Sequence, residues 1–117
     1  MAVQAETRLQ NEIRLALSSK CDQVTTWRNH TGCLQDGDGK WIRFGLCPGS
    51  SDLIGIRKLK ITQDMVGQEI GQFVALEIKT DTGKARPDQY TFLDHVNERG
   101  GLGAIIRSSA EAVELLS

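Results

Sequence analysis

Apolar residues recur with a helical period over residues 5–19 of this chain. Leu9, Ile13 and Leu17 lie four positions apart, with mainly polar or charged residues between them, a pattern that predicts an amphipathic helix. Glu6 stands three positions before Leu9 and therefore falls on the same face. The predicted helix thus carries one acid on the side that is expected to face the core.

Short apolar runs separated by segments rich in Gly, Pro and Asp follow this helix and predict strands. Pro87 suits the first turn of a second helix, and Ser108 or Ser109 suits the cap of a third. The first expected elements are a strand at 24–30 and a strand at 41–44, which form a hairpin through a loop at 31–40. Strands at 53–56 and 72–79, a helix at 87–98, a strand at 104–107 and a final helix follow. This order implies an α/β domain with a mixed sheet flanked by helices.

Composition indicates the number of domains and the cellular compartment. A chain of 117 residues with 39% apolar and 25% charged residues fits one globular domain, 1–117. Cys21, Cys33 and Cys47 are odd in number and widely spaced, which argues against a zinc knuckle or a disulfide framework and favours a reducing compartment. The sequence shows neither a membrane-length apolar stretch nor a signal peptide, so we expect a soluble cytoplasmic protein.

Charge is unevenly distributed although the net charge is only −1. Between Lys40 and Lys60 there are five basic residues and a single acid, Asp52. This excess permits a basic surface that binds phosphate. A solvated strand whose lysines guard an exposed edge explains it equally well.

Polar residues also occupy positions that ordinary packing gives to apolar ones. Glu77 and Lys79 end an apolar run and share one face of their strand. Gln89 lies on the face of Leu93 in the following helix, within its first turn, and Asp52 begins a strand. Taken singly, a salt bridge, a helix cap and a strand-end acid explain them, but their coincidence points to a site at one end of the sheet.

The chemistry of these groups suits a divalent cation. If the strands of Asp52 and Glu77 are neighbours, two carboxylates meet, and like charges at close range need a cation between them. With the Ile78 carbonyl they form an oxygen set typical of Mg²⁺ or Mn²⁺. Lys79 then holds a water or stabilises a phosphate, and Glu6 accepts a proton or holds a second ion through water.

The spacing of these residues resembles a nuclease family. Gly49-x-x-Asp52 followed by Glu77-x-Lys79 is similar to the PD-(D/E)xK core, and the virus-type replication-repair nuclease (VRR-Nuc) branch is the closer match. Ser51 replaces the proline of the family motif, a change that affects the turn rather than the metal-binding acid. The other segments that resemble this branch are Glu6 to Gln10, Trp27-Arg28-Asn29, Gly49 to Gly55, Gln89 and Gly100-Gly101.

The resemblance implies a restriction-endonuclease-like fold and a stand-alone bacteriophage nuclease. It implies a homodimer that uses Mg²⁺ or Mn²⁺ to cleave branched DNA, such as Holliday junctions, in the bacterial host cytoplasm. Alternatives are a non-catalytic DNA-junction binder, or a flap or nicking nuclease acting with a partner. The expected catalytic residues are Glu6, Asp52, Glu77, Lys79 and Gln89, the metal ligands Glu6, Asp52, Glu77 and Ile78, and the DNA-binding residues Arg28, Asn29, Arg43, Ser50, Ser51, Lys84 and Arg86.

Overall fold

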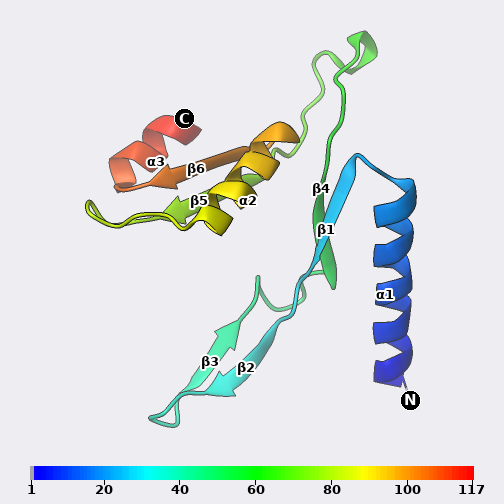
Figure 1. Cartoon of the computed structure of the whole chain (residues 1–117), viewed down its shortest axis with the longest axis vertical. Helices are drawn as coiled ribbons and strands as arrows, with labels where there is room; N and C mark the ends of the chain where they lie inside the picture. Colours follow the sequence, from blue (N-terminus) through cyan, green and yellow to red (C-terminus); the bar gives the residue numbers. More distant parts are fainter. Residues whose placement is uncertain (1) are drawn as a thin grey trace. The chain divides into compact units, whose positions relative to one another are not determined.

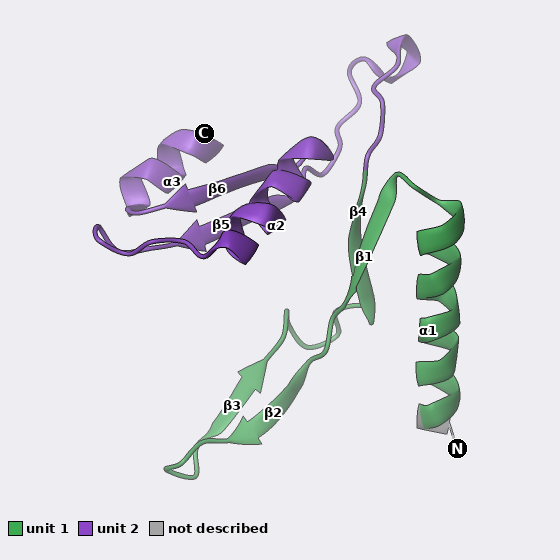
Figure 2. Cartoon of the chain, viewed as in Figure 1, with its two compact units in different colours: residues 1–57 green, residues 58–117 purple. Residues whose placement is uncertain are grey.

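The computed structural model describes residues 2–117 and divides the chain into two compact units (Figures 1 and 2). Unit 1 is Met1–Arg57 and unit 2 is Lys58–Ser117. Asp52 and Glu6 belong to unit 1, whereas Glu77, Lys79 and Gln89 belong to unit 2. Each unit is therefore described by itself.

Unit 1 begins with helix α1 (Ala2–Lys20), which extends slightly beyond the predicted range and packs against strand β1 (Val24–Arg28). Strand β1 pairs in antiparallel fashion with β4 (Leu53–Arg57), and Trp27 lies opposite Ile54. The expected apolar face of α1 is only partly covered, since Leu9 is 55% and Ile13 41% exposed. Glu6 is likewise exposed, so its predicted place on a core-facing side is wrong.

A separate antiparallel hairpin follows, made of β2 (Gly32–Gln35) and β3 (Trp41–Phe44). The prediction of a loop over residues 31–40 is therefore wrong for residues 32–35. The predicted hairpin is also wrong, because β3 pairs with β2, whereas the strand predicted at 24–30 pairs as β1 with β4. Asp36 closes the turn between β2 and β3, because its Oδ1 accepts hydrogen bonds from the backbone N–H groups of Asp38 (2.9 Å) and Lys40 (2.8 Å). Strand β2 has only four residues and adjoins Asp and Gly residues that are typical of turns. The sequence around it therefore has the composition of a loop and does not predict the strand.

Unit 2 is built around a β–α–β crossover. Strands β5 (Val74–Ile78) and β6 (Leu102–Ile106) are parallel, and helix α2 (Pro87–Glu98) connects them (Figure 1). Before β5 the chain forms a short 3₁₀ turn, η1 (Gln63–Met65). After β6 comes α3 (Ser109–Leu116), whose first turn is capped by Ser108 Oγ accepting from the Glu111 N–H.

Helix α2 packs closely on β6, and this contact contains the most buried residues of the unit. Leu93 is 6% exposed and Val96 is fully buried. A Cβ placed on Gly103 would lie 2.9 Å from the Leu93 carbonyl oxygen, so glycine is what permits this approach. The Asn97 amide donates to the Gly103 carbonyl (3.0 Å) and accepts from its N–H (2.8 Å), which fixes the end of α2 to the strand.

The mixed α/β class predicted from the sequence is confirmed. The strands of the described residues pair into three two-stranded sheets, two antiparallel and one parallel. A single central sheet with the PD-(D/E)xK topology stays a prediction. No helix within residues 2–117 is long and apolar enough to cross a membrane.

Candidate functional site

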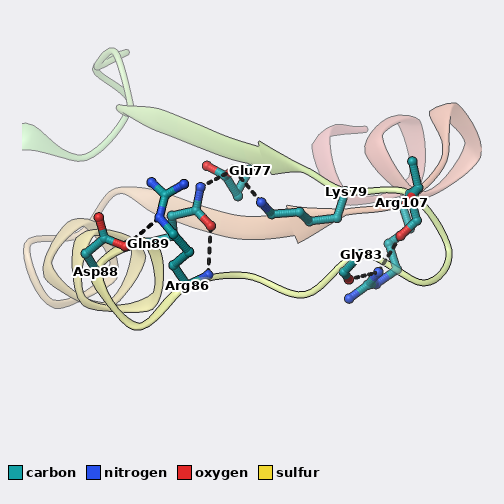
Figure 3. Close-up of polar contacts among 8 residues, drawn as sticks. Glu77, Lys79, Gly83, Arg86, Asp88, Gln89 and Arg107 are labelled. Carbon is teal, nitrogen blue, oxygen red and sulfur yellow. Dashed lines mark hydrogen bonds and ion pairs between the residues drawn. The ribbon is translucent and has the colours of Figure 1, made fainter.

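The side chains of Glu77, Lys79 and Gln89 meet in unit 2 (Figure 3). Gln89 Nε2 donates a hydrogen bond of 2.7 Å to Glu77 Oε1, and the Lys79 ammonium nitrogen lies 3.4 Å from the same oxygen. The side chains of Lys79 and Glu77 are 19% and 30% exposed. The convergence expected from the sequence is therefore present for these three residues.

Local structure explains how residues from a strand and a helix come together. Alternation along β5 sends Glu77 and Lys79 to one face, and Ile78 points to the other, where it is 67% exposed. A parallel crossover returns the chain across a single face of the sheet. Here α2 starts with Pro87, which places Gln89 in the first turn, facing Glu77.

The Gln89 amide is held in one orientation. Its Oε1 accepts a hydrogen bond of 2.8 Å from the backbone N–H of Arg86, which precedes the first turn of α2. Because the oxygen is used there, the amide nitrogen must face Glu77. Gln89 is thus both a helix cap, as its position in the first turn suggests, and an orienting partner of Glu77, the candidate catalytic carboxylate.

Next to this cluster, Arg86 and Asp88 form an exposed ion pair. Arg86 Nε lies 3.1 Å from Asp88 Oδ1. The hydrogen bond from Arg86 lowers the pKa of Asp88 below its ordinary value of 3.8, although its limited desolvation opposes this. The hydrogen bond to Asp88, its negative charge and, more weakly, that of Glu77 raise the pKa of Arg86. Arg86 therefore stays protonated beside the cluster, and the charge of Asp88 partly offsets its own.

The donor atoms around Glu77 suit a hard divalent cation. Gln89 and Lys79 both use Oε1, which leaves Oε2 for another partner. The Lys79 N–H donates to the Ile106 carbonyl (3.0 Å) and the Leu102 N–H to the Phe73 carbonyl (2.8 Å), so alternation in the ladder turns the Ile78 carbonyl toward the other edge of β5. A free carboxylate oxygen and a free carbonyl are ligands that Mg²⁺ and Mn²⁺ accept.

Arg107, which sequence reasoning missed, fixes the loop between Lys79 and α2. Its Nη1 donates to the backbone carbonyl oxygen of Gly83 (2.8 Å; Figure 3). It also donates to the carbonyl oxygens of Thr80 (2.6 Å) and, at 3.4 Å, Asp81. The residue follows directly after β6, in line with Lys79 on the parallel neighbour. Its position after a strand paired with β5 is the one sequence signal that indicates it.

In unit 1, Asp52 is exposed, directly precedes β4 and lies beside Asn29. The Asn29 N–H donates to the Asp52 carbonyl (2.8 Å), and its amide nitrogen donates to Ser50 Oγ (2.6 Å) and the Ser51 carbonyl (3.0 Å). Asn29 and Ser50, both expected to contact DNA, therefore hydrogen-bond to each other.

The remaining expected DNA contacts are distributed over both units. Arg28 and Arg43 are exposed on β1 and β3, while Lys84 and Arg86 are exposed ahead of α2. Arg86 pairs with Asp88, so part of its charge is already compensated. These positions keep long cationic side chains accessible to a phosphate, which is the general requirement for backbone contacts.

Acidic and metal-ligating side chains do not gather in larger groups. Among residues 2–117, no three His, Cys, Asp or Glu side chains lie together in an arrangement that could hold an ion. Glu77 with the Ile78 carbonyl, and Asp52 separately, are thus the candidate ligands. Compared with known proteins, the chain matches no family model, no curated protein and no solved structure.

Proposed function

We propose that this chain is a DNA endonuclease that requires Mg²⁺ or Mn²⁺ and acts on branched DNA as a homodimer. The observation that carries the proposal is the meeting of Glu77, Lys79 and Gln89 at the end of β5. Asp52 is a further proposed metal ligand, and Glu6 a proposed proton acceptor. The motif order along the sequence supports the same assignment to a PD-(D/E)xK nuclease of VRR-Nuc type.

The arrangement of Glu77 and Lys79 is better explained by a metal-binding catalytic site than by a salt bridge that only stabilises the fold. A partly exposed ion pair contributes at most about 1 kcal/mol to stability and has no need of a third, oriented partner. Gln89 fixes Glu77 Oε1, so Oε2 is directed by the same contact. Pre-orientation of a carboxylate by a second residue is characteristic of metal sites.

In the proposed reaction a water oxygen bonds to phosphorus, the P–O3′ bond breaks, and the proton of the water ends on the 3′ oxygen. The products carry a 5′-phosphate and a 3′-hydroxyl. A bound divalent cation supplies Lewis acidity and a more acidic water. The Lys79 ammonium orients the attacking water or offsets the charge that develops on the phosphate oxygens. Gln89 keeps Glu77 in position throughout.

The test compares labelled four-way junction, flap, single-stranded and duplex DNA in Mg²⁺, Mn²⁺ or EDTA. We expect cleavage of branched DNA that EDTA abolishes. Glu77→Gln and Lys79→Met each remove a charge with little change of shape, and each should lower the rate about 100-fold or more. The matched controls Glu69→Gln and Lys20→Met alter exposed residues outside the site and should keep the wild-type rate.

Three outcomes would each contradict a part of the proposal. Metal-independent DNA binding with no cleavage by the wild-type protein would indicate the non-catalytic junction binder. Cleavage at the wild-type rate by both folded charge variants would refute the assignment of Glu77 and Lys79. Light scattering during the same preparation tests the homodimer, since a monomer at every concentration used for cleavage would refute it.

A further inference from the structure

Asn29 makes four hydrogen bonds with one short loop. Its amide nitrogen donates to Ser50 Oγ (2.6 Å) and to the Ser51 carbonyl (3.0 Å), and its Oδ1 accepts from the Leu46 N–H (3.4 Å). Its own backbone N–H donates to the Asp52 carbonyl (2.8 Å). One half-buried asparagine therefore hydrogen-bonds to the first residue of the segment 46–52 and to its last three.

The segment that Asn29 holds ends at a candidate metal ligand. Ser50 donates to the Cys47 carbonyl through both its N–H (3.1 Å) and its Oγ (2.7 Å). Pro48 and Gly49, with Gly49 at φ +84°, occupy the middle of this turn, as in a type II turn. Asn29 joins this turn at Ser50, and the backbone proceeds directly from there to Asp52.

We infer that Asn29 is a positioning residue for the Asp52 carboxylate, an inference that rests on the proposed function. Asp52 directly precedes β4 and is exposed. Its place is set by the backbone on either side of it. Asn29 fixes the N-terminal side through Ser50 and Ser51 and fixes Asp52 itself through its carbonyl. The loop is thereby held in one conformation before a cation arrives.

Removal of the Asn29 side-chain contacts should measurably weaken metal binding at Asp52. Asn29→Ala deletes the contacts to Leu46, Ser50 and Ser51 but retains the backbone hydrogen bond to Asp52. Loss of a residue that orients a metal ligand typically weakens metal affinity or activity about 10- to 100-fold. We expect the Mn²⁺ concentration at half-saturation to rise about 10-fold, because the loop must be ordered on binding.

The readout is Mn²⁺-induced broadening of the backbone amide signals around Asp52 in NMR spectra. Wild type, Asn29→Ala and the control Asn11→Ala, which changes an exposed asparagine of α1, are titrated in parallel. Ser50→Ala removes only the hydroxyl link and should give an intermediate midpoint, which serves if Asn29→Ala does not fold. Amide exchange in residues 46–51 should accelerate in the same order.

The outcomes separate this inference from the proposed function. A higher midpoint in Asn29→Ala than in Asn11→Ala supports positioning. Equal midpoints in folded proteins, or no broadening at Asp52 in the wild type, overturn it. Absence of DNA cleavage together with intact Mn²⁺ binding at Asp52 refutes the nuclease but leaves the role of Asn29 to be decided by the midpoints.

Discussion

Substitution of Gln89 by alanine removes two hydrogen bonds with different partners. The acceptor of the Arg86 N–H is lost, which costs about 1 kcal/mol, as for other helix caps. The donor to Glu77 is also lost, and a charge-assisted bond at a side chain that is 30% exposed contributes about 1 kcal/mol after allowance for solvent. The free energy of unfolding should therefore fall by about 2 kcal/mol, a shift of about 8 °C in Tm at this chain length.

A double-mutant cycle separates these two contributions. Glu77→Ala, Gln89→Ala and the double variant are unfolded in urea with detection by circular dichroism. Because the cap on Arg86 is independent of Glu77, only the Glu77–Gln89 bond should couple, by about 1 kcal/mol. Gln68→Ala, at an exposed loop glutamine, should stay within about 0.5 kcal/mol of wild type.

The cycle can refute the reasoning directly. A coupling energy below about 0.3 kcal/mol is within the error of additivity and would mean that Gln89 acts as a helix cap without orienting Glu77. Cleavage assays on the same proteins add a second criterion. Gln89→Ala should slow cleavage at saturating metal, whereas a pure cap would leave the folded enzyme as active as wild type.

Three further predictions concern stability and pH. Because the pKa of Asp88 is lowered in the folded state, its pairing with Arg86 stabilises the fold at pH values above the pKa of Asp88 in the unfolded chain. This contribution is lost as the pH falls through the pKa of Asp88 in the folded protein. Asp88→Asn should therefore reduce the acid-side loss of stability in urea titrations below about pH 4, and an unchanged pH profile would contradict this. Gly103→Ala forces a Cβ against α2 and should cost about 1–3 kcal/mol by thermal unfolding, while Gly71→Ala, where nothing lies within 4 Å, should be nearly neutral; equal effects would argue against close packing. Arg107→Lys keeps the charge but loses the planar donor group, so amide exchange in residues 80–83 should accelerate, and unchanged exchange would show that the guanidinium does not hold this loop.

Elements with strong terminal signals were predictable from the sequence. Helix α2 begins and ends at the predicted residues, Pro87 and Glu98, because proline marks its first turn and glycine follows its end. The meeting of Gln89 with Glu77 was also predictable, since a short loop must bring the first turn of α2 back to the end of its strand. Both predictions rest on local chain geometry.

Other features lacked such local signals. Strand β2 is short and adjoins a loop of Gly and Asp, so its pairing with β3 determines it more than its own composition. Arg107 contacts backbone carbonyls of a loop 24 or more positions earlier, and a carbonyl carries no residue-specific signature. The apolar period of α1 predicts a helix correctly but does not state how much of a face becomes covered, and Leu9 and Ile13 stay 55% and 41% exposed.

The fixed amide of Gln89 also gives the protein a built-in spectroscopic reporter. A ligand that binds Glu77 and withdraws electron density from its Oε1 changes the polarisation of the Gln89 amide. The oxygen of that amide accepts a hydrogen bond from the Arg86 N–H. Hydrogen bonds in series polarise one another. The chemical shift of one backbone proton at the start of α2 therefore follows events at a carboxylate on β5, and a titration can be read there without touching either charged side chain.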